Sequence, residues 1–305
     1  MRSAPQIMRQ GRWAPWYYLA PALLIMLIFI VYPTVRTFYV SIRNDDNSSW
    51  ASDECEEGES CWGILENYHA ALTKDQVGAQ NVTALKNTAL WLVIMVPGTV
   101  ILGLLFAVLT DRVKYESFAK SLIFMPMAIS FVGAGVIWRF VYDANPDIGL
   151  LNAIIGIFGV EPQTWRATDP PGNTIFIIIV GIWVWTGFTM TIIAAALKGI
   201  PDEILEASRV DGANEFQVFF RIMLPQLIPT LAVVMTTMTI ITLKIFDIVW
   251  VMRGIQTDVL ATRMVDELTG RHFGLSASFA VIIIILTIPI MIYNVRRFTI
   301  EEGQR

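Results

Sequence analysis

The residues of this chain that could carry chemistry do not form the motifs of an enzyme. The sequence has no Gly-x-x-x-x-Gly-Lys-Ser/Thr phosphate loop, no His-Glu-x-x-His zinc motif and no Gly-x-Ser-x-Gly nucleophile elbow. The two histidines, His69 and His272, fall in segments expected to be loops, where surface placement without function is their default. The sequence therefore predicts no catalytic residue, no metal site and no cofactor bound by the chain itself.

Polar and aromatic residues within apolar runs are candidates for a transport pathway instead. Lys244 and Asp247 are three residues apart and would share one face of a helix. Another run carries residues that could stack on a sugar ring or hydrogen-bond to it: Trp183, Trp185, Thr186, Gly187 and Thr189. Mutual neutralisation of the two charges, and packing of the rings against a neighbouring helix, are equally open interpretations. Trp91 and Trp138 are expected to be interfacial belt residues.

The composition is typical of a protein that crosses a membrane several times. Of the 305 residues, 55% are hydrophobic and 16% are charged, whereas a soluble domain averages about 25% charged residues. The net charge of −4, without a basic cluster, argues against nucleic-acid binding. The sequence predicts an all-α polytopic bundle of six transmembrane helices, each near the ~20 residues that span a bilayer, at 17–40, 87–110, 121–142, 174–197, 227–252 and 275–293.

The Lys and Arg residues near the ends of these runs predict the orientation. With six spans both termini share one side, and the side that holds them carries more Lys and Arg than the other. The first run is too long for the core of a cleavable signal peptide, so we interpret it as a membrane helix. We expect a transmembrane domain at 17–293, with cytoplasmic tails at 1–16 and 294–305, a cytoplasmic loop at 198–226 and an external loop at 43–86.

The external loop contains the two cysteines of the chain, Cys55 and Cys61. An even pair five residues apart in an oxidising compartment is compatible with a disulfide that closes a small loop. A metal site is the weaker interpretation, because two cysteines without a nearby histidine do not complete a tetrahedral site. The disulfide is the favoured prediction.

The loop 198–226 is polar, but its pattern is that of an ordered helical hairpin. Pro201 can occupy the first position of a helix, and Gly212 can adopt the positive φ that ends it. Asn214 and Gln217 are spaced as a capping box for a second short helix. Three aromatic residues then share one apolar face, and we expect them to pack under the loop against the fourth and fifth spans: Phe216, Phe219 and Phe220.

The spacing within this hairpin also carries a family resemblance. The chain reads Glu206-Ala207-Ser208, three residues, Gly212, nine residues, Ile222, one residue, Leu224-Pro225, and the Leu-Pro pair is expected to close the second helix. This pattern resembles the EAA loop of the membrane permeases of binding-protein-dependent ABC importers. Ser208 stands where the family usually has a second alanine, while Asp211, Ala213 and Phe219 also fit the sugar-importer version. The alternative is an ordinary cytoplasmic helix hairpin.

The resemblance implies the type I ABC importer permease fold and a separate source of energy. A dimer of ABC ATPases would bind ATP-Mg, and the hairpin would dock in a groove of that dimer. Glu206 would contact a basic group there, and Gly212 would set the angle between the two short helices. The small residues Ala207, Ser208 and Ala213 would permit close approach. ATP-driven closure would then rotate the spans and alternate access to a central site.

Two further stretches resemble the MalF-type permeases of carbohydrate importers. Phe246-Asp247-Ile248-Val249-Trp250-Val251 is similar to their Phe-Asp-x-x-x-Val element, and Trp185-Thr186-Gly187-Phe188 to their Trp-x-Gly-Phe element. The usual Gly-Gly-Pro that follows is replaced by Met252-Arg253-Gly254-Ile255-Gln256. The resemblance implies an importer of an α-glucoside or other disaccharide in a bacterial cytoplasmic membrane. Its implied partners are a MalG-type second permease, the ATPase dimer and an extracytoplasmic sugar-binding protein.

Other functional classes predict other features. A secondary transporter or channel would need no ATPase and would be expected to show repeated halves, and we find no such repeat in the sequence. A membrane-embedded enzyme would need paired acidic residues or histidines within its spans, and only Asp247 lies clearly inside one. Within the resembled family, a glycerol phosphate or other polyol importer is the alternative to a disaccharide importer.

Overall fold

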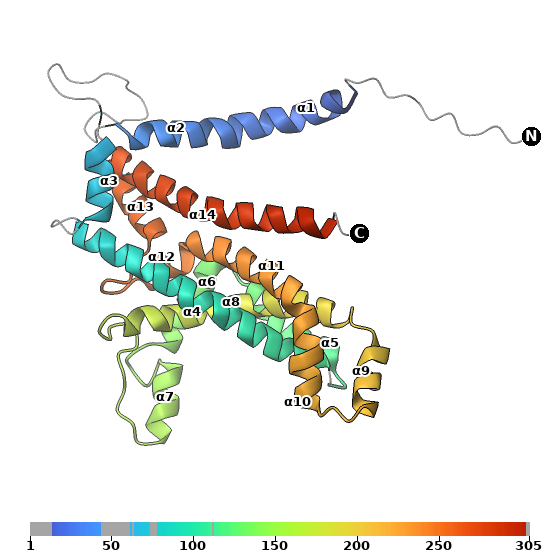
Figure 1. Cartoon of the computed structure of the whole chain (residues 1–305). Coiled ribbons are helices and arrows are strands. Elements are labelled where there is room, and N and C mark those ends of the chain that lie inside the picture. Colours follow the sequence, from blue (N-terminus) through green and yellow to red (C-terminus); the bar gives the residue numbers. More distant parts are fainter. Residues whose placement is uncertain (1–13, 44–61, 63, 74–77, 112, 303–305) are drawn as a thin grey trace, which may run out of the picture.

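The computed structural model describes residues 14–43, 62, 64–73, 78–111 and 113–302 of the chain (Figure 1). Cys55 and Cys61 lie outside these residues, so their disulfide stays a prediction. The described part is built from helices, with one isolated antiparallel bridge between Arg43 and Trp62. The all-α class is thus confirmed.

The helices follow one another without a sheet. Their bounds are α1 (Ala14–Met26), η1 (Leu27–Val31), α2 (Tyr32–Ser41), α3 (Ile64–Leu72), α4 (Gly78–Asp111), α5 (Glu116–Phe124), η3 (Met125–Ala128), α6 (Phe131–Val141), α7 (Leu150–Ile157), α8 (Gly172–Leu197), α9 (Asp202–Val210), α10 (Glu215–Val218), η4 (Phe219–Met223), α11 (Leu224–Leu243), α12 (Asp247–Met252), α13 (Leu260–Thr269) and α14 (Phe273–Glu302). Within the described residues, five helical stretches are long and apolar enough to cross a membrane: Trp16–Ser41, Ala79–Asp111, Gly172–Leu197, Glu215–Leu243 and Phe273–Tyr293.

The third expected span is bent rather than straight. Its two halves, Glu116–Ala128 and Phe131–Val141, meet at an angle of 99°. Ile129 is extended (ψ 140°) and Ser130 begins α6 as its N-cap, with its hydroxyl accepting the Gly133 N–H. Counting the bent pair as one span gives up to six spans.

The fifth expected span, 227–252, is broken, which corrects the expectation of one continuous helix. The helix α11 ends at Leu243, and a new helix, α12, begins at Asp247. Phe246 between them has φ −135° and ψ −61°, outside the helical region. Lys244 and Asp247 therefore do not share a face of one helix, and the spacing argument for them was wrong.

The core of the bundle is the contact between α4 and α8. Trp91 of α4 is fully buried with its ring against Gly181 of α8, where an added Cβ would lie 2.7 Å from a ring carbon. Gly103 of α4 approaches Thr189 of α8 more closely still, because an added Cβ would lie 2.2 Å from the Thr189 hydroxyl. Small residues let membrane helices pack in this way. The expectation that Trp91 is a belt residue was wrong, because this side chain is sealed inside the bundle.

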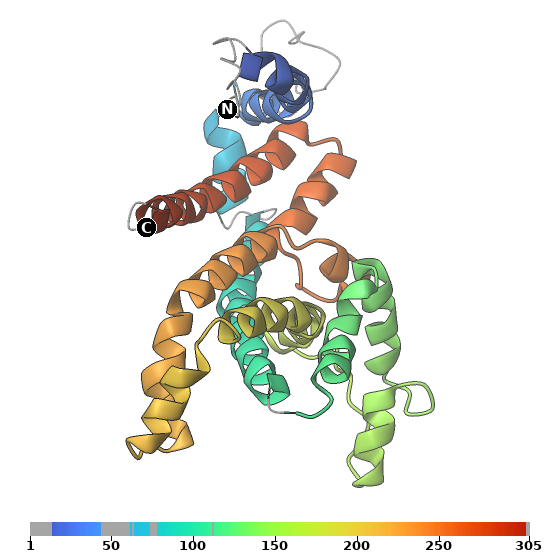
Figure 2. The ribbon, with the colours of Figure 1, turned by 90° about the vertical axis from the view of Figure 1, so that its right-hand side faces the viewer.

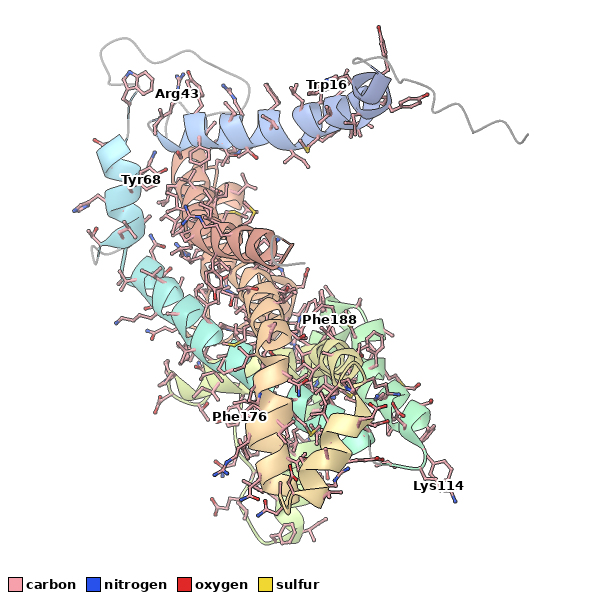
Figure 3. The ribbon with its side chains drawn as sticks, turned by 45° about the vertical axis from the view of Figure 1, so that its right-hand side comes forward. Trp16, Arg43, Tyr68, Lys114, Phe176 and Phe188 are labelled. Carbon is pink, nitrogen blue, oxygen red and sulfur yellow. The ribbon has the colours of Figure 1, made fainter. Side chains whose placement is uncertain are left out.

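The first span stands apart from this core. The most apolar stretch of Trp16–Ser41 has none of its residues buried, and Trp16 points away from the rest of the chain (Figure 3). Its end is held by α3, where Asn67 donates to the carbonyls of Ser41 and Arg43 and the Tyr68 hydroxyl donates to the Ser41 hydroxyl.

The two ends of the bundle differ in what they carry. We call the end that holds α9 and α10 the motif end, and the opposite one the far end; α1 begins and α14 ends toward the motif end (Figure 1). At the far end, buried Arg263 of α13 is paired with Glu267 and donates to Asn81 of α4. The hydrogen bond to Asn81 joins the segment after the broken span to α4, whereas the ion pair lies within α13.

Candidate functional site

The first helix of the motif hairpin, α9, is short and strongly amphipathic. Pro201 precedes it in an extended conformation as the N-cap, one position earlier than expected. Asp202 and Glu203 occupy the first turn, where carboxylates interact favourably with the positive end of the helix dipole. Ser208 is the buried residue of the helix, and its hydroxyl donates to the Leu205 carbonyl. The burial of Ser208 agrees with the small residue expected at this position.

The turn after α9 has the geometry of a Schellman motif. Gly212 has a φ of 85°, as expected. The Gly212 N–H donates to the Arg209 carbonyl, and the Ala213 N–H to the Ser208 carbonyl, both at 3.1 Å. Arg209 also pairs with Glu215 across the turn at 2.9 Å, and this contact raises the pKa of the guanidinium. The turn is thus stabilised by two backbone hydrogen bonds and by the exposed Arg209–Glu215 ion pair.

The second helix begins with the expected capping box and then runs on into the membrane. Asn214 and Gln217 accept each other's backbone N–H at 2.9 Å. The helix does not close at Leu224-Pro225, which corrects that expectation. Instead a π turn, η4, joins α10 to α11, and the Leu224 N–H donates to the Phe219 carbonyl five residues back. Pro225 lacks an N–H and its ring would clash with the carbonyl four residues back in a regular helix, so a wider turn ahead of it is favourable.

The aromatic residues of this helix face a different span from the one expected. Phe216 and Phe220 stack with ring centroids 5.0 Å apart. Together with Phe219 and Leu224 they form a groove with residues of α4 (Ile101, Leu104, Leu105, Val108 and Leu109). These aromatic residues thus line a groove with the second span, which the sequence did not indicate.

The hairpin presents a mixed surface at its tip. Glu206, Ala207, Asp211 and Gly212 are exposed, whereas Ala213 and Ile222 are half-buried. Val210 is 87% exposed, which is unusual for a valine next to a charged helix face. Sequence reasoning missed Val210; the signal was an apolar residue at the end of an otherwise polar helix. The tip thus combines a carboxylate, small residues and one apolar side chain.

A second ion pair joins the hairpin to the start of the third span. Lys198, which follows α8 directly, contacts the Glu116 carboxylate at 2.6 Å, and this hydrogen bond raises the pKa of Lys198. Lys120 binds the same carboxylate. The loop before the hairpin and the short turn between the second and third spans are therefore linked at the motif end.

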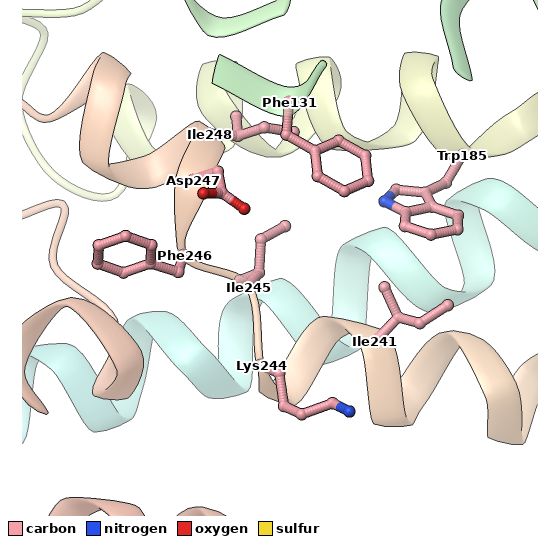
Figure 4. Close-up of a pocket in the computed structure, with 8 residues that line it drawn as sticks. All are labelled: Phe131, Trp185, Ile241, Lys244, Ile245, Phe246, Asp247 and Ile248. Carbon is pink, nitrogen blue, oxygen red and sulfur yellow. The ribbon is translucent and has the colours of Figure 1, made fainter. Parts of the chain in front are cut away.

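The break in the fifth span opens a cavity within the bundle. The cavity has a volume of about 190 Å³. Phe131 of α6 and Trp185 of α8 lie on one side of it with ring centroids 5.5 Å apart, and the Asp247 carboxylate lies near them (Figure 4). The remaining lining comes from the break and its flanks: Ile241, Lys244, Ile245, Phe246 and Ile248. Two aromatic rings and two side chains of opposite charge therefore line the same cavity.

The other predicted pathway residues lie elsewhere. Thr186 donates to the Ile182 carbonyl, and buried Thr189 donates to the Thr99 carbonyl of α4 at 2.8 Å. Gly187 packs on the backbone of α5, where an added Cβ would lie 2.7 Å from the Ile123 carbonyl oxygen. Trp183 meets Trp138 edge-on with centroids 5.5 Å apart. Sequence reasoning missed Phe131, because only the bend of the third span brings it to the cavity.

These features define the class to which the chain belongs. Residues 84–296 match the family model described as "Binding-protein-dependent transport system inner membrane component". The match covers the core, the broken span and the hairpin, and the chain is a member of this family of multi-pass membrane permeases.

Individual relatives align over nearly the whole chain. It is 44% identical to the alpha-glucoside transport system permease protein AglF of Rhizobium meliloti, over 95% of this chain and 83% of that protein. It is also 44% identical to the osmoprotective compounds uptake permease protein GgtC of Synechocystis, over 94% of this chain and 100% of that protein. The trehalose/maltose transport system permease protein MalF of Thermococcus litoralis is 29% identical, with 91% and 92% covered.

A solved structure shares the fold. A bacterial ABC transporter for the import of the acidic polysaccharide alginate contains a chain that superimposes with a TM-score of 0.76 at 20% identity, covering 94% of this chain and 96% of that one. The family and the fold together assign the chain to the permeases of the type I ABC importers, as the motif spacing predicted.

Proposed function

We propose that this chain is the MalF-type permease subunit of an importer for an α-glucoside or related disaccharide. The observation that carries the proposal is the cavity at the broken fifth span, where Phe131 and Trp185 supply ring faces and Lys244 and Asp247 supply a donor and an acceptor. A sugar ring offers one apolar face and a rim of hydroxyls. The cavity matches both features.

The size of the cavity supports a site shared between two subunits. Ligand pockets commonly measure about 300–1,000 Å³, whereas this cavity holds about 190 Å³. Lys244 and Asp247 are exposed in the single chain. A MalG-type second permease would complete the site and cover these charges, and an extracytoplasmic sugar-binding protein would deliver the substrate to it.

The energy would come from a dimer of ABC ATPases, which binds ATP-Mg and receives the hairpin. Glu206, Ala207 and the exposed tip around Gly212 would be the contact, with Val210 as its apolar anchor. Force would pass through the continuous helix from α10 into α11 and so to the break that lines the cavity. Alternating access follows if docking moves α11 relative to α12.

The orientation follows from the same arrangement. The ATPase requires the motif end to be cytoplasmic. Because α1 begins and α14 ends toward that end (Figure 1), both termini would be in the cytoplasm, and the far end would be external. The excess of Lys and Arg on that side agrees with this placement.

The named substrates of the relatives favour a glucoside. AglF is named for alpha-glucosides and the Thermococcus protein for trehalose and maltose. A second candidate is an osmoprotective compound, which is favoured by the equal identity to GgtC over its full length. Both are small, uncharged or weakly charged polar solutes, so the cavity alone does not separate them.

Uptake by the reconstituted complex tests the proposal. The permease pair, ATPase dimer and binding protein are placed in liposomes with ATP inside, and labelled maltose, trehalose, sucrose, glycine betaine and glycerol 3-phosphate are offered in turn. We expect ATP-dependent uptake of a disaccharide. Uptake of glycine betaine or glycerol 3-phosphate alone would overturn the glucoside assignment, and uptake without ATPase would overturn the importer assignment.

Two tryptophans of α8 provide a matched pair of variants. Trp185→Ala removes a ring from the cavity, whereas Trp183→Ala removes a ring that packs on Trp138 outside it. Loss of one aromatic stacking contact is worth about 0.5–1.5 kcal/mol, so we expect the half-saturating substrate concentration to rise several-fold for Trp185→Ala only. Equal effects of both changes would mean that Trp185 serves in helix packing and does not contact the substrate.

A further inference from the structure

The segment that follows the bent third span is uncharged and exposes its apolar residues. Between Ile148 and Val160 there is no Asp, Glu, Lys or Arg. The short helix α7 lies in its middle, and Ile157 and Phe158 are 81% and 79% exposed. Further apolar side chains are exposed on the same segment: Ile148, Leu150, Ile154 and Val160. An exposed group of this kind marks a surface that something apolar covers.

This segment is held in place by a single buried amide. Asn152 of α7 is fully buried, and its side-chain nitrogen donates to the carbonyls of Asp143, Ala144 and Gln163. Its side-chain oxygen accepts the backbone N–H of Gln163 and the ring N–H of Trp165. The only polar side chain of α7 is thus turned inward, where it joins residues 143–144 to residues 163–165. The outward face of α7 therefore carries only apolar side chains.

The direction of α7 relative to the spans identifies what covers this face. In Figure 1 the long helices α8 and α14 run across the view, whereas α7 runs from top to bottom at the far end. It keeps that direction after the turn about the vertical axis in Figure 2. The helix therefore runs across the direction of the spans, which places it along the plane of a membrane. It also projects away from the bundle in both views.

The preceding half-span also exposes apolar residues, and side chains of both charges border the segment. Val136, Ile137 and Phe140 of α6 are exposed on the preceding half-span. Burial, and then the charge of Arg139 in the last turn of α6, lower the pKa of the Arg166 guanidinium, while the carboxylate of Asp143 opposes this shift. An apolar surface bordered by charged side chains matches the order of acyl chains and headgroups at a bilayer surface.

We propose that α7 is an interfacial helix that lies in the outer leaflet of the membrane, with Ile157 and Phe158 among the acyl chains. The proposal rests on the orientation given under the proposed function. A contact with the binding protein is disfavoured, because a partner that must dissociate leaves an interface about as polar as ordinary surface, and this face has no polar group. A lipid-anchored α7 would hold the outer end of the bent span at a constant depth while the other spans move.

The depth of a spin label tests the proposal in the full complex. In a Cys55→Ser/Cys61→Ser background, Ile157→Cys is labelled and the complex is reconstituted in phosphatidylglycerol/phosphatidylethanolamine liposomes. Collision with oxygen and with a water-soluble nickel chelate gives the depth. The matched control is Glu161→Cys, the first charged position after the segment and exposed. We expect the label at 157 to lie about 5–10 Å deeper than the one at 161.

Each outcome decides the proposal. Equal accessibility of the two labels to the nickel chelate means that α7 lies in water, and exclusion of both reagents at 157 means that a protein covers the face; either overturns it. If Ile157→Cys fails to assemble, Ile154→Cys on the same face replaces it. Binding-protein-dependent uptake is measured in the same liposomes. If the label at 157 is not deeper but uptake is intact, only the interfacial helix is refuted. If the unlabelled background itself shows no uptake, the proposed function is refuted instead.

Discussion

Substitution of Gly212 measures how strongly the hairpin geometry controls docking. Gly212 has φ of 85°, and an added Cβ would meet nothing within 4 Å. Gly212→Ala therefore introduces no clash, and its whole cost is that of a left-handed conformation, about 1–2 kcal/mol. That cost shifts the equilibrium between the Schellman turn and its alternatives by a factor of about 5–30. If docking requires this turn, the apparent affinity for the ATPase falls by at most this factor, because it scales with the fraction of the chain that holds the turn.

The assay titrates purified ATPase onto membranes that contain the permease pair. We expect Gly212→Ala to raise the half-saturating ATPase concentration by up to about 5–30-fold, and Gly212→Asn to raise it less, because asparagine tolerates positive φ better than other side chains. Gly156→Ala is the matched control, since an added Cβ there also meets nothing and no positive φ is required. Wild-type binding by Gly212→Ala, or an asparagine variant as weak as the alanine variant, would refute the reasoning from backbone conformation.

Three further substitutions test the helix contact, the far-end ion pair and the π turn. Gly103→Ala would place a Cβ 2.2 Å from the Thr189 hydroxyl and 2.9 Å from a backbone nitrogen of α8, so we expect a loss of about 1–3 kcal/mol, read as a lower temperature of half-inactivation in detergent. Glu267→Gln removes the nearer carboxylate partner of buried Arg263 and leaves Asp266 at 3.5 Å, which should cost at most about 3–5 kcal/mol in the same assay. Pro225→Ala restores an N–H donor and lets the π turn become a regular α-helical turn. This change rotates the hairpin relative to α11 by about 100°, the rotation of one helical residue. We expect the variant complex to assemble but to hydrolyse ATP without coupled uptake.

Each of these changes has a control at a similar site. Gly98→Ala meets only the flexible end of Ile182, so it should cost less than Gly103→Ala. Asp258→Asn removes a partner of Arg253, which is about one-third exposed and keeps Asp266, so it should be milder than the loss at Glu267. Pro229→Ala lies inside α11, where no π turn is present, and should leave coupling intact. Reversal of any of these orders would contradict the corresponding account.

The motif hairpin was largely predictable because its structure is determined by neighbours in the sequence. The positive φ of Gly212 and the mutual bonds of Asn214 and Gln217 depend on residues at most a few positions apart. Such turns and caps have the same geometry in any protein, so their residue types identify them. The direction of Phe216 and Phe220 was not predictable in this way, because one additional residue in a π turn rotates everything before it.

The cavity could be predicted only in part. Trp185, Lys244 and Asp247 were recognised because charged and aromatic residues are conspicuous in an apolar run. Phe131 was not, because nothing distinguishes it from the other apolar residues of its span. The break at Lys244–Phe246 has no glycine or proline to mark it, and the argument that Lys244 and Asp247 share a face failed for that reason.

By itself, the sequence determined the all-helical membrane class, the family and the local geometry of the hairpin, since these follow from hydrophobicity and from short-range hydrogen bonding. Only the tertiary structure decided where the third span bends, where the fifth breaks and which side chains meet in the cavity. The physical reason is that apolar runs of similar composition are interchangeable in a local window. Their bends and breaks are stabilised by contacts between helices, such as those of Gly187 with α5, and the partners in these contacts are far apart in the chain.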